Sequence, residues 1–139
     1  HINLRESDRR VRPYSIRAAA HFLTHALDIE PEEIKATIAG FGHERPDEYR
    51  IGMSIRDSDD VAHGIVWPLL GADEDSSDTP VQVETQLHEA GVRDVLLLDQ
   101  LFPLEFCDDC GMPMYPTPEG ETSHAELPED LPQAPAHLH

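Results

Sequence analysis

The sequence is poor in several residue types, and each shortage excludes a class of protein. Two cysteines in 139 residues are too few for a small secreted domain held together by disulfides. The chain has no run of about 20 apolar residues, so we expect no membrane span. It also shows no signal-peptide pattern. From these absences we expect a cytoplasmic protein.

Basic residues are scarce as well. Lys and Arg number 10 against 28 Asp and Glu, and the formal net charge is −18. Such a surface repels phosphate backbones and anionic lipids, so we expect binding to neither nucleic acid nor membranes. A basic protein is the partner class that it would attract. One group of basic residues is best interpreted as a counterweight to the acidic surface: Arg5, Arg9, Arg10, Arg12 and Arg17.

Common catalytic motifs are missing too. The chain has neither of the usual glycine-rich phosphate-binding patterns and no serine nucleophile elbow. An enzyme is therefore the less favoured interpretation.

Hydrophobic periodicity predicts the main elements. Residues 1–13 are expected to be irregular up to Pro13, followed by a helix over 15–28. A helical turn at Pro31 should lead into a strand over 34–42, with a short helix as the alternative. Period-two patterns predict two half-buried strands, 49–56 and 61–67, that form a hairpin. A helix over 80–90 and a strand over 92–98 complete the list.

This order predicts an α+β fold. We expect a small, mostly antiparallel sheet in helix-strand-strand-strand-helix-strand order, with the helices on one face. The apolar run from Val95 to Leu98 predicts a last strand that is covered on both faces or central in its sheet. A ferredoxin-like arrangement is the alternative if residues 1–13 hold a further strand.

Two parts of the chain are distinguished by composition. Residues 1–112 are predicted to form the α+β domain, which ends in a CxxC knuckle. Residues 113–139 carry six of the twelve prolines and are predicted to be an extended acidic tail, packed on the domain or on a partner subunit. An ordered tail of this kind needs a surface to pack on, and we therefore expect a homodimer.

The segment from Cys107 to Gly111, with the sequence Cys-Asp-Asp-Cys-Gly, indicates a zinc site. A two-residue gap lets two thiolates reach one tetrahedral ion, and His124 is a candidate third ligand. The fourth ligand stays open between His63, His43, His88, Asp109 and a residue of another subunit. Plain thiols are the second interpretation. Redox catalysis is the least favoured, because the acidic neighbours should raise the pKa of the thiols.

Other histidines allow a different hypothesis. His21 and His25 share one helix face, but Phe22 stands where the zincin motif needs Glu, so we interpret them as residues on the polar side of the helix. His63 is in phase with apolar strand residues, and Asp99 ends the last strand. A core histidine and a polar strand end are the simpler interpretation. The alternative is a metal-dependent enzyme with a site near His63, Asp99 and the Cys107/Cys110 knuckle.

Three segments carry a resemblance to a family: Arg45 to Gly52, Val61 to Gly71, and Phe102 to Gly111 together with His124 to Glu126. They resemble an uncharacterised bacterial family known only as a domain of unknown function. The resemblance implies that the chain is the C-terminal part of a longer protein, and it implies no activity and no site residues. The first hypothesis for function is thus a non-enzymatic, zinc-stabilised assembly or regulatory module.

Overall fold

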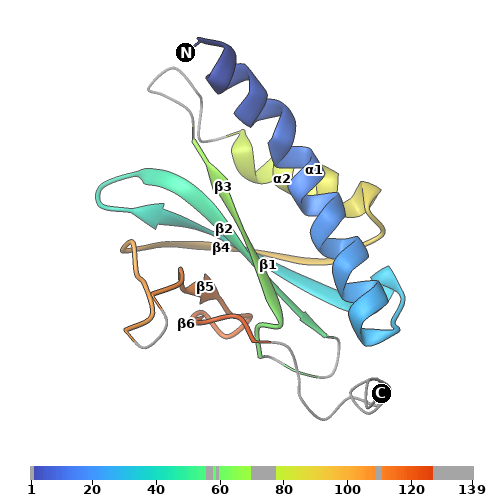
Figure 1. Cartoon of the computed structure of the whole chain (residues 1–139). Coiled ribbons are helices and arrows are strands. Elements are labelled where there is room, and N and C mark those ends of the chain that lie inside the picture. Colours follow the sequence, from blue (N-terminus) through green and yellow to red (C-terminus); the bar gives the residue numbers. More distant parts are fainter. Residues whose placement is uncertain (1, 56–57, 59, 70–77, 109–110, 127–139) are drawn as a thin grey trace.

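The fold was obtained as a computed structural model that describes residues 2–55, 58, 60–69, 78–108 and 111–126, with side chains from Tyr14 onward. The elements in chain order are α1 (Ile2–Leu27), the 3₁₀ turn η1 (Pro31–Glu33), β1 (Ile34–Gly42), β2 (Pro46–Ile55), β3 (His63–Pro68), α2 (Thr79–Glu89), β4 (Asp94–Phe102), β5 (Tyr115–Pro116) and β6 (Thr122–Ser123) (Figure 1). Neither described helix is both long and apolar enough to cross a bilayer.

The main sheet has four strands in the order β3-β2-β1-β4. β2 pairs antiparallel with both β1 and β3, whereas β4 pairs parallel with β1. A parallel neighbour cannot be reached by a tight turn, and α2 supplies the long connection that carries the chain from one edge of the sheet to the other. The predicted α+β class and element order are confirmed, with a mixed sheet in which two of the three pairings are antiparallel.

One face of the sheet packs against both helices. The stripe predicted on the first helix, Ile16, Ala20, Leu23 and Leu27, is buried there. Val83 and Leu87 of α2 join it. From the sheet come the alternate side chains Ile34, Ala36 and Ile38 of β1, Tyr49, Ile51 and Met53 of β2, and Ile65 and Trp67 of β3. This period-two set is what a strand presents to one side.

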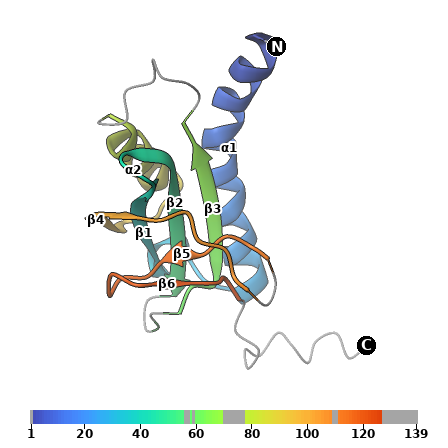
Figure 2. The same cartoon turned by 90° about the vertical axis from the view of Figure 1, so that its left-hand side faces the viewer.

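The opposite face is covered by residues 103–108 and 111–126, here called the strap, which contains the two-stranded sheet of β5 and β6 (Figure 2). Gly52 and Gly64 stand directly opposite each other on β2 and β3. A Cβ at Gly52 would collide with the carbonyl oxygen of Pro116, and one at Gly64 with the ring of Tyr115. The paired glycines therefore leave a bare strip of sheet on which the strap lies flat.

Several local predictions are wrong. Residues 2–13 are helical, so Pro13 lies inside α1, and the extra strand of a ferredoxin-like arrangement is not there. Proline fixes a φ that suits a helix and removes one N–H donor, so it can stand within a longer helix at a cost. The second strand is not half-buried, because Arg50, Gly52 and Ser54 are buried beneath the strap.

The last strand also differs from the prediction. β4 is an edge strand, and Leu96 and Leu97 are 41% and 45% exposed. The helical turn and strand predicted from Pro31 to residue 42 are confirmed as η1 and β1. The predicted knuckle includes Asp109 and Cys110, which lie outside the described residues. The boundary predicted between residues 112 and 113 stays a prediction.

Candidate functional site

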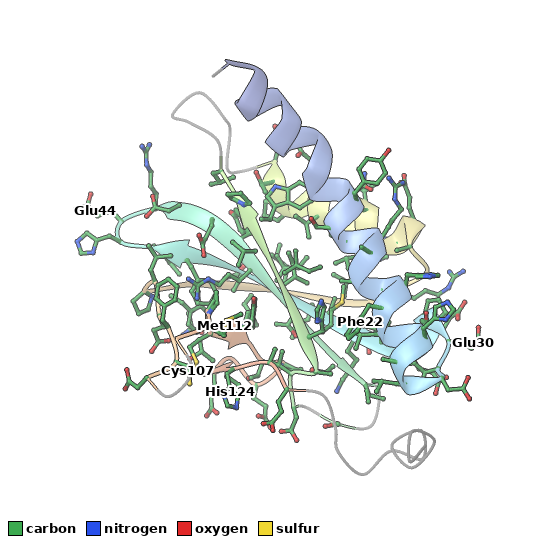
Figure 3. All side chains as sticks on the ribbon, in the orientation of Figure 1. Phe22, Glu30, Glu44, Cys107, Met112 and His124 are labelled. Atoms are coloured by element: carbon green, nitrogen blue, oxygen red, sulfur yellow. The ribbon has the colours of Figure 1, made fainter. Side chains whose placement is uncertain are left out.

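Cys107 and His124 meet on the strap, 17 residues apart in the chain. The Sγ atom of Cys107 lies 3.6 Å from Nδ1 of His124. Figure 3 shows the two side chains close together below the sheet, on the side away from Phe22 of α1. Of the three predicted metal ligands, these two are brought together, and Cys110 lies outside the described residues.

Backbone hydrogen bonds hold Cys107 in a tight reversal of the chain. Its N–H donates to the carbonyl oxygen of Met112 at 2.8 Å, and the N–H of Gly111 donates to the carbonyl oxygen of Cys107 at 2.8 Å. Gly111 has a φ of +74°, a left-handed conformation that glycine adopts without steric cost. The sequence therefore bends here because a glycine stands directly behind the second cysteine.

His124 is positioned by the hairpin of β5 and β6. The turn between these strands is closed by the N–H of Thr117, which donates to the carbonyl oxygen of Glu121 at 2.8 Å. Two residues after His124, the N–H of Glu126 donates to the carbonyl oxygen of Val61 at 2.9 Å, which ties this end of the strap to the start of β3. His124 thus sits between two anchored stretches of backbone.

A buried arginine fastens the strap to the sheet. The Arg50 side chain is fully buried, and its Nη1 donates to the carbonyl oxygens of Glu105 and Met114 at 2.7 and 2.8 Å. Its Nε donates to the Glu48 carboxylate at 2.6 Å. Because Glu105 and Met114 flank the bend that carries Cys107, Arg50 fixes the base of this bend.

Two aromatic rings enclose the same guanidinium group. Its carbon lies 4.5 Å from the ring centroid of Phe41 and 5.2 Å from that of Phe106. Nη2 has no hydrogen-bond partner among the described residues. Ring faces are electron-rich and attract a cation, so the two rings partly replace that partner.

The electrostatics of His124 depend on its two neighbours. The hydrogen bond with Cys107 and the negative charge of its thiolate raise the pKa of His124, and Glu126 adds to the shift. The Glu126 carboxylate lies 3.5 Å from Nε2, the nitrogen that faces away from the sulfur. One imidazole therefore links a sulfur on one side with a carboxylate on the other.

Comparison with known proteins places the sequence in a family. The sequence matches, over residues 1–138, the model of a family described as "Protein of unknown function (DUF2863)". The chain belongs to the DUF2863 family. The resemblance to an uncharacterised family is thereby confirmed, and the printed description adds no substrate or activity. No curated protein and no solved structure matches the sequence.

Candidates for a fourth ligand are not gathered at the pair. In this DUF2863 chain His43 follows β1, His88 lies on α2 and His63 is on β3. Among the residues that the structure describes, no group of three or more His, Cys, Asp or Glu side chains is arranged to hold a metal ion. Asp109, the remaining candidate within the chain, lies outside them.

His63 and Asp99, the pair of the enzyme hypothesis, are far apart. They lie on β3 and β4, the two outer strands of the sheet. Strands are spaced about 4.8 Å apart, so three spacings separate the two residues by about 14 Å. His63 instead packs 5.1 Å from the ring of Phe22, and burial lowers its pKa. His63 is half-buried, so it is not the fully buried core histidine that the simpler interpretation predicts.

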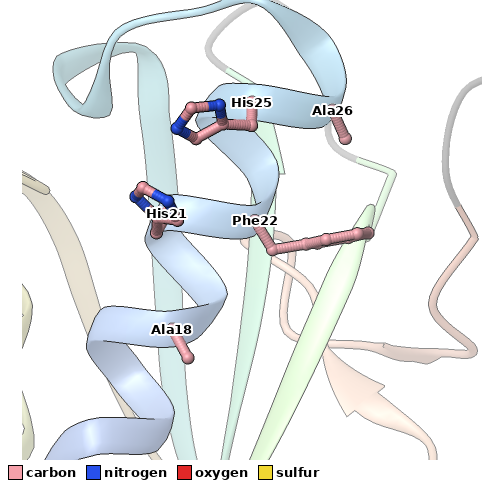
Figure 4. Close-up of a pocket in the computed structure, with 5 residues that line it drawn as sticks. All are labelled: Ala18, His21, Phe22, His25 and Ala26. Carbon is pink, nitrogen blue, oxygen red and sulfur yellow. The ribbon is translucent and has the colours of Figure 1, made fainter.

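His21 and His25 lie side by side on the exposed face of α1, with ring centroids 4.2 Å apart (Figure 4). With Ala18, Phe22 and Ala26 they line a shallow hollow of about 570 Å³. Both histidines are exposed, as the interpretation of a polar helix side predicts. No third ligand joins them among the described residues.

Sequence reasoning missed Arg50 and Glu126. Arg50 alternates with apolar residues, and this pattern predicts that its side chain lies on the solvent-facing side of the strand. One signal was present, since glycines that stand at the same level on two paired strands indicate close approach by another backbone. Glu126 carries no such signal, because its role depends on where the strap places His124.

Proposed function

We propose that Cys107, Cys110 and His124 bind one zinc ion, and that this metal site fixes the strap on the sheet of a non-enzymatic assembly or regulatory module. The observation that carries the proposal is the 3.6 Å separation of Cys107 Sγ and His124 Nδ1. Thiolate ligands persist in reducing compartments, so the proposal includes a cytoplasmic location.

The separation of these two atoms suits one shared zinc ion. Zinc lies about 2.3 Å from thiolate sulfur and about 2.0 Å from imidazole nitrogen, and at a tetrahedral angle the two ligand atoms are then about 3.6 Å apart. A direct hydrogen bond between thiol and imidazole has the same length, so the distance supports the metal without deciding for it. A measurement of the zinc content distinguishes the metal site from a hydrogen bond.

The surroundings of the pair supply further support. Zinc-bound histidines commonly donate their other ring N–H to a carboxylate, which fixes the ring and raises its basicity. Glu126 lies on that side of His124, at 3.5 Å from Nε2. The donors are soft or borderline, as zinc prefers. A water or a residue of a partner would fill the fourth position.

The metal would act by closing the strap rather than by catalysis. Cys107 stands near the start of the strap and His124 near its end, and Arg50 holds the base of the Cys107 bend. One ion between them would join these two ends of the strap into a single closed loop over β2 and β3. The covered face then becomes a rigid surface on which assembly depends.

Elemental analysis of untagged protein tests the proposal. We expect about one zinc per chain in the wild type. Cys107→Ser and His124→Ala should each lose most of it. His21→Ala is the matched control, since it also removes an imidazole, but from α1. Wild-type protein that holds no zinc after purification and after incubation with the metal would disprove the proposal.

A second candidate function follows from the order of the same three groups. Cys107, His124 and Glu126 stand as nucleophile, base and orienting acid do in thiol hydrolases. A catalytic thiol would react with iodoacetamide much faster than a zinc-bound thiolate, and Glu126→Gln would slow it. Rapid alkylation of metal-free protein, with loss of that rate in His124→Ala, would favour this function.

A further inference from the structure

The outer edge of β4 exposes apolar residues that the sequence predicts to be buried. Residues 95–98 are all apolar, yet Leu96 and Leu97 are about half exposed and Leu101 is 36% exposed. Among the described strands, β4 pairs only with β1. Its other side therefore presents a row of backbone donors and acceptors, flanked by leucines on both faces.

The opposite edge of the sheet is protected, which makes this contrast informative. β3 ends at Pro68, whose nitrogen carries no hydrogen, and α1 packs beside it with the Phe22 ring 5.1 Å from His63. β4 has neither proline nor lysine from Asp94 to Phe102, and its irregular stretch, which could protect an edge, begins only after Leu97. Edges that natural proteins leave unprotected and apolar commonly pair with another strand.

We propose that β4 is an interface with a second copy of this chain, paired antiparallel about a twofold axis at Leu96. The register with β1 is regular from Asp94 to Leu97 and shifts before Leu101, so the proposed pairing is centred on the regular part and extends from Arg93 to Asp99. The two four-stranded sheets would then form one continuous sheet of eight strands.

Charge complementarity selects a second copy as the partner and fixes the register. With the axis at Leu96, Val95 of one copy lies opposite Leu97 of the other, and Arg93 lies opposite Asp99. Arg93, Val95 and Leu97 share one face by alternation, Val95 marks that face as the helix side, and the proposed pairing places Asp99 on it as well. Each dimer would thus gain two Arg93–Asp99 pairs at the two ends of an apolar centre.

Neighbouring registers lack this match. An axis between Leu96 and Leu97 is excluded by geometry, because it would place Asp94 opposite Asp99 although these two residues point to opposite faces of the sheet. Moving it to Leu97 places Val95 opposite Asp99 and leaves Arg93 opposite Leu101. Of these registers, only the one with its axis at Leu96 combines an apolar centre with an Arg93–Asp99 pair at each end. A specific isologous contact requires one such preferred register.

Sedimentation equilibrium of the 139-residue chain tests the proposal first. We expect a concentration-dependent mass that approaches twice the 15.6 kDa of one chain. Leu96→Lys would bring two ammonium groups together at the axis and should weaken the dimer at least about tenfold. Leu101→Lys is the matched control. It adds the same charge to the same strand, but beyond the residues that pair, and it should leave the dimer intact.

A charge exchange tests the register itself. Arg93→Asp alone places Asp opposite Asp99, and Asp99→Arg alone places Arg opposite Arg93, so each variant should dimerise roughly tenfold more weakly. An equimolar mixture of the two variants restores both pairs, and we expect the dimer to return as a heterodimer. Circular dichroism of each variant verifies its fold.

Two results would overturn the proposal. One is wild-type protein that stays monomeric across the micromolar range. The other is a dimer that resists Leu96→Lys and shows no gain on mixing the two charge variants, since its interface would then lie elsewhere. The mixing experiment keeps the proposal testable even if Leu96→Lys does not fold, because Arg93 and Asp99 are both exposed.

Discussion

At the scale of single residues, Arg50 joins the strap to the sheet. It is a charged residue in the middle of β2 with no exposed side-chain surface. Burying a cation is costly unless it is compensated, and here two carbonyl oxygens and a carboxylate accept hydrogen bonds from Nη1 and Nε, while two aromatic rings face the guanidinium group. Because both carbonyl oxygens belong to the strap, the residue couples two layers of the fold.

Replacing Arg50 by Met should therefore loosen the strap. The change removes charge-assisted hydrogen bonds to Glu105, Met114 and Glu48, and we expect a loss of about 3 kcal/mol in the free energy of unfolding, measured by urea denaturation. Arg17→Met is the control, because Arg17 is exposed and stacks on exposed Tyr14. Equal losses in both variants would contradict the role of Arg50.

His63 makes a prediction about pH. Burial lowers its pKa from the ordinary value of 6.5, so the folded protein favours the neutral ring. The unfolded chain then binds the proton more tightly. The stabilisation by neutral His63 is complete above pH 6.5 and is lost as the pH falls through the lowered pKa of the folded state.

Urea unfolding of wild type and His63→Gln at and below pH 6.5 measures this effect. We expect the wild type to lose stability more steeply than the variant as the pH falls, because the other histidines are common to both proteins. Parallel curves would show that His63 titrates normally in the folded protein.

At the scale of elements, the strap decides which strand faces are buried. Without it, β2 and β3 would each have one solvated face, as their alternating sequences suggest. With it, Gly52 and Gly64 become points of contact between two backbones. The strap needs these glycines because any side chain there would lift it from the sheet and separate Arg50 from its carbonyl partners.

Gly64→Ala should accordingly destabilise the protein by about 1–3 kcal/mol, since its methyl group would overlap the Tyr115 ring. Tyr115→Leu removes that ring and costs stability of its own, but the double variant should lose less than the sum of the two single changes. A double-mutant cycle by thermal or urea unfolding measures the difference. Strict additivity would mean that Tyr115 does not rest on Gly64.

At the scale of the whole molecule, charge is the dominant property. With a formal net charge of −18, the compact state is opposed by repulsion among its own carboxylates. We propose a basic protein as the class of partner for this surface, and such binding would weaken as salt screens the charges.

Added salt should therefore stabilise the folded chain. We expect the melting temperature to rise between low and moderate NaCl concentrations, followed by calorimetry or circular dichroism, because screening relieves repulsion among like charges. A melting temperature that falls with NaCl would instead show that attractive ion pairs outweigh the net repulsion.

Local sequence by itself determined most of the elements of this protein. Helical spacing placed the core stripe of α1, period-two alternation placed β2 and β3, and Gly91, with a φ of +97°, follows the end of α2. These features depend on neighbours in the chain, so a sequence pattern records them. The acidic character also followed from the sequence, and the nearness of Cys107 to His124 agrees with the prediction of His124 as a candidate third ligand.

The tertiary structure alone decided the second face and the edges of the sheet. Burial of Arg50 and the exposure of Leu96 depend on strand order and on where the strap comes to rest, which are contacts between distant residues. An apolar run can stand in a central strand or in an edge strand, and its sequence does not tell which. An arginine in an alternating strand can likewise face solvent or lie beneath the strap. Only the fold distinguishes them.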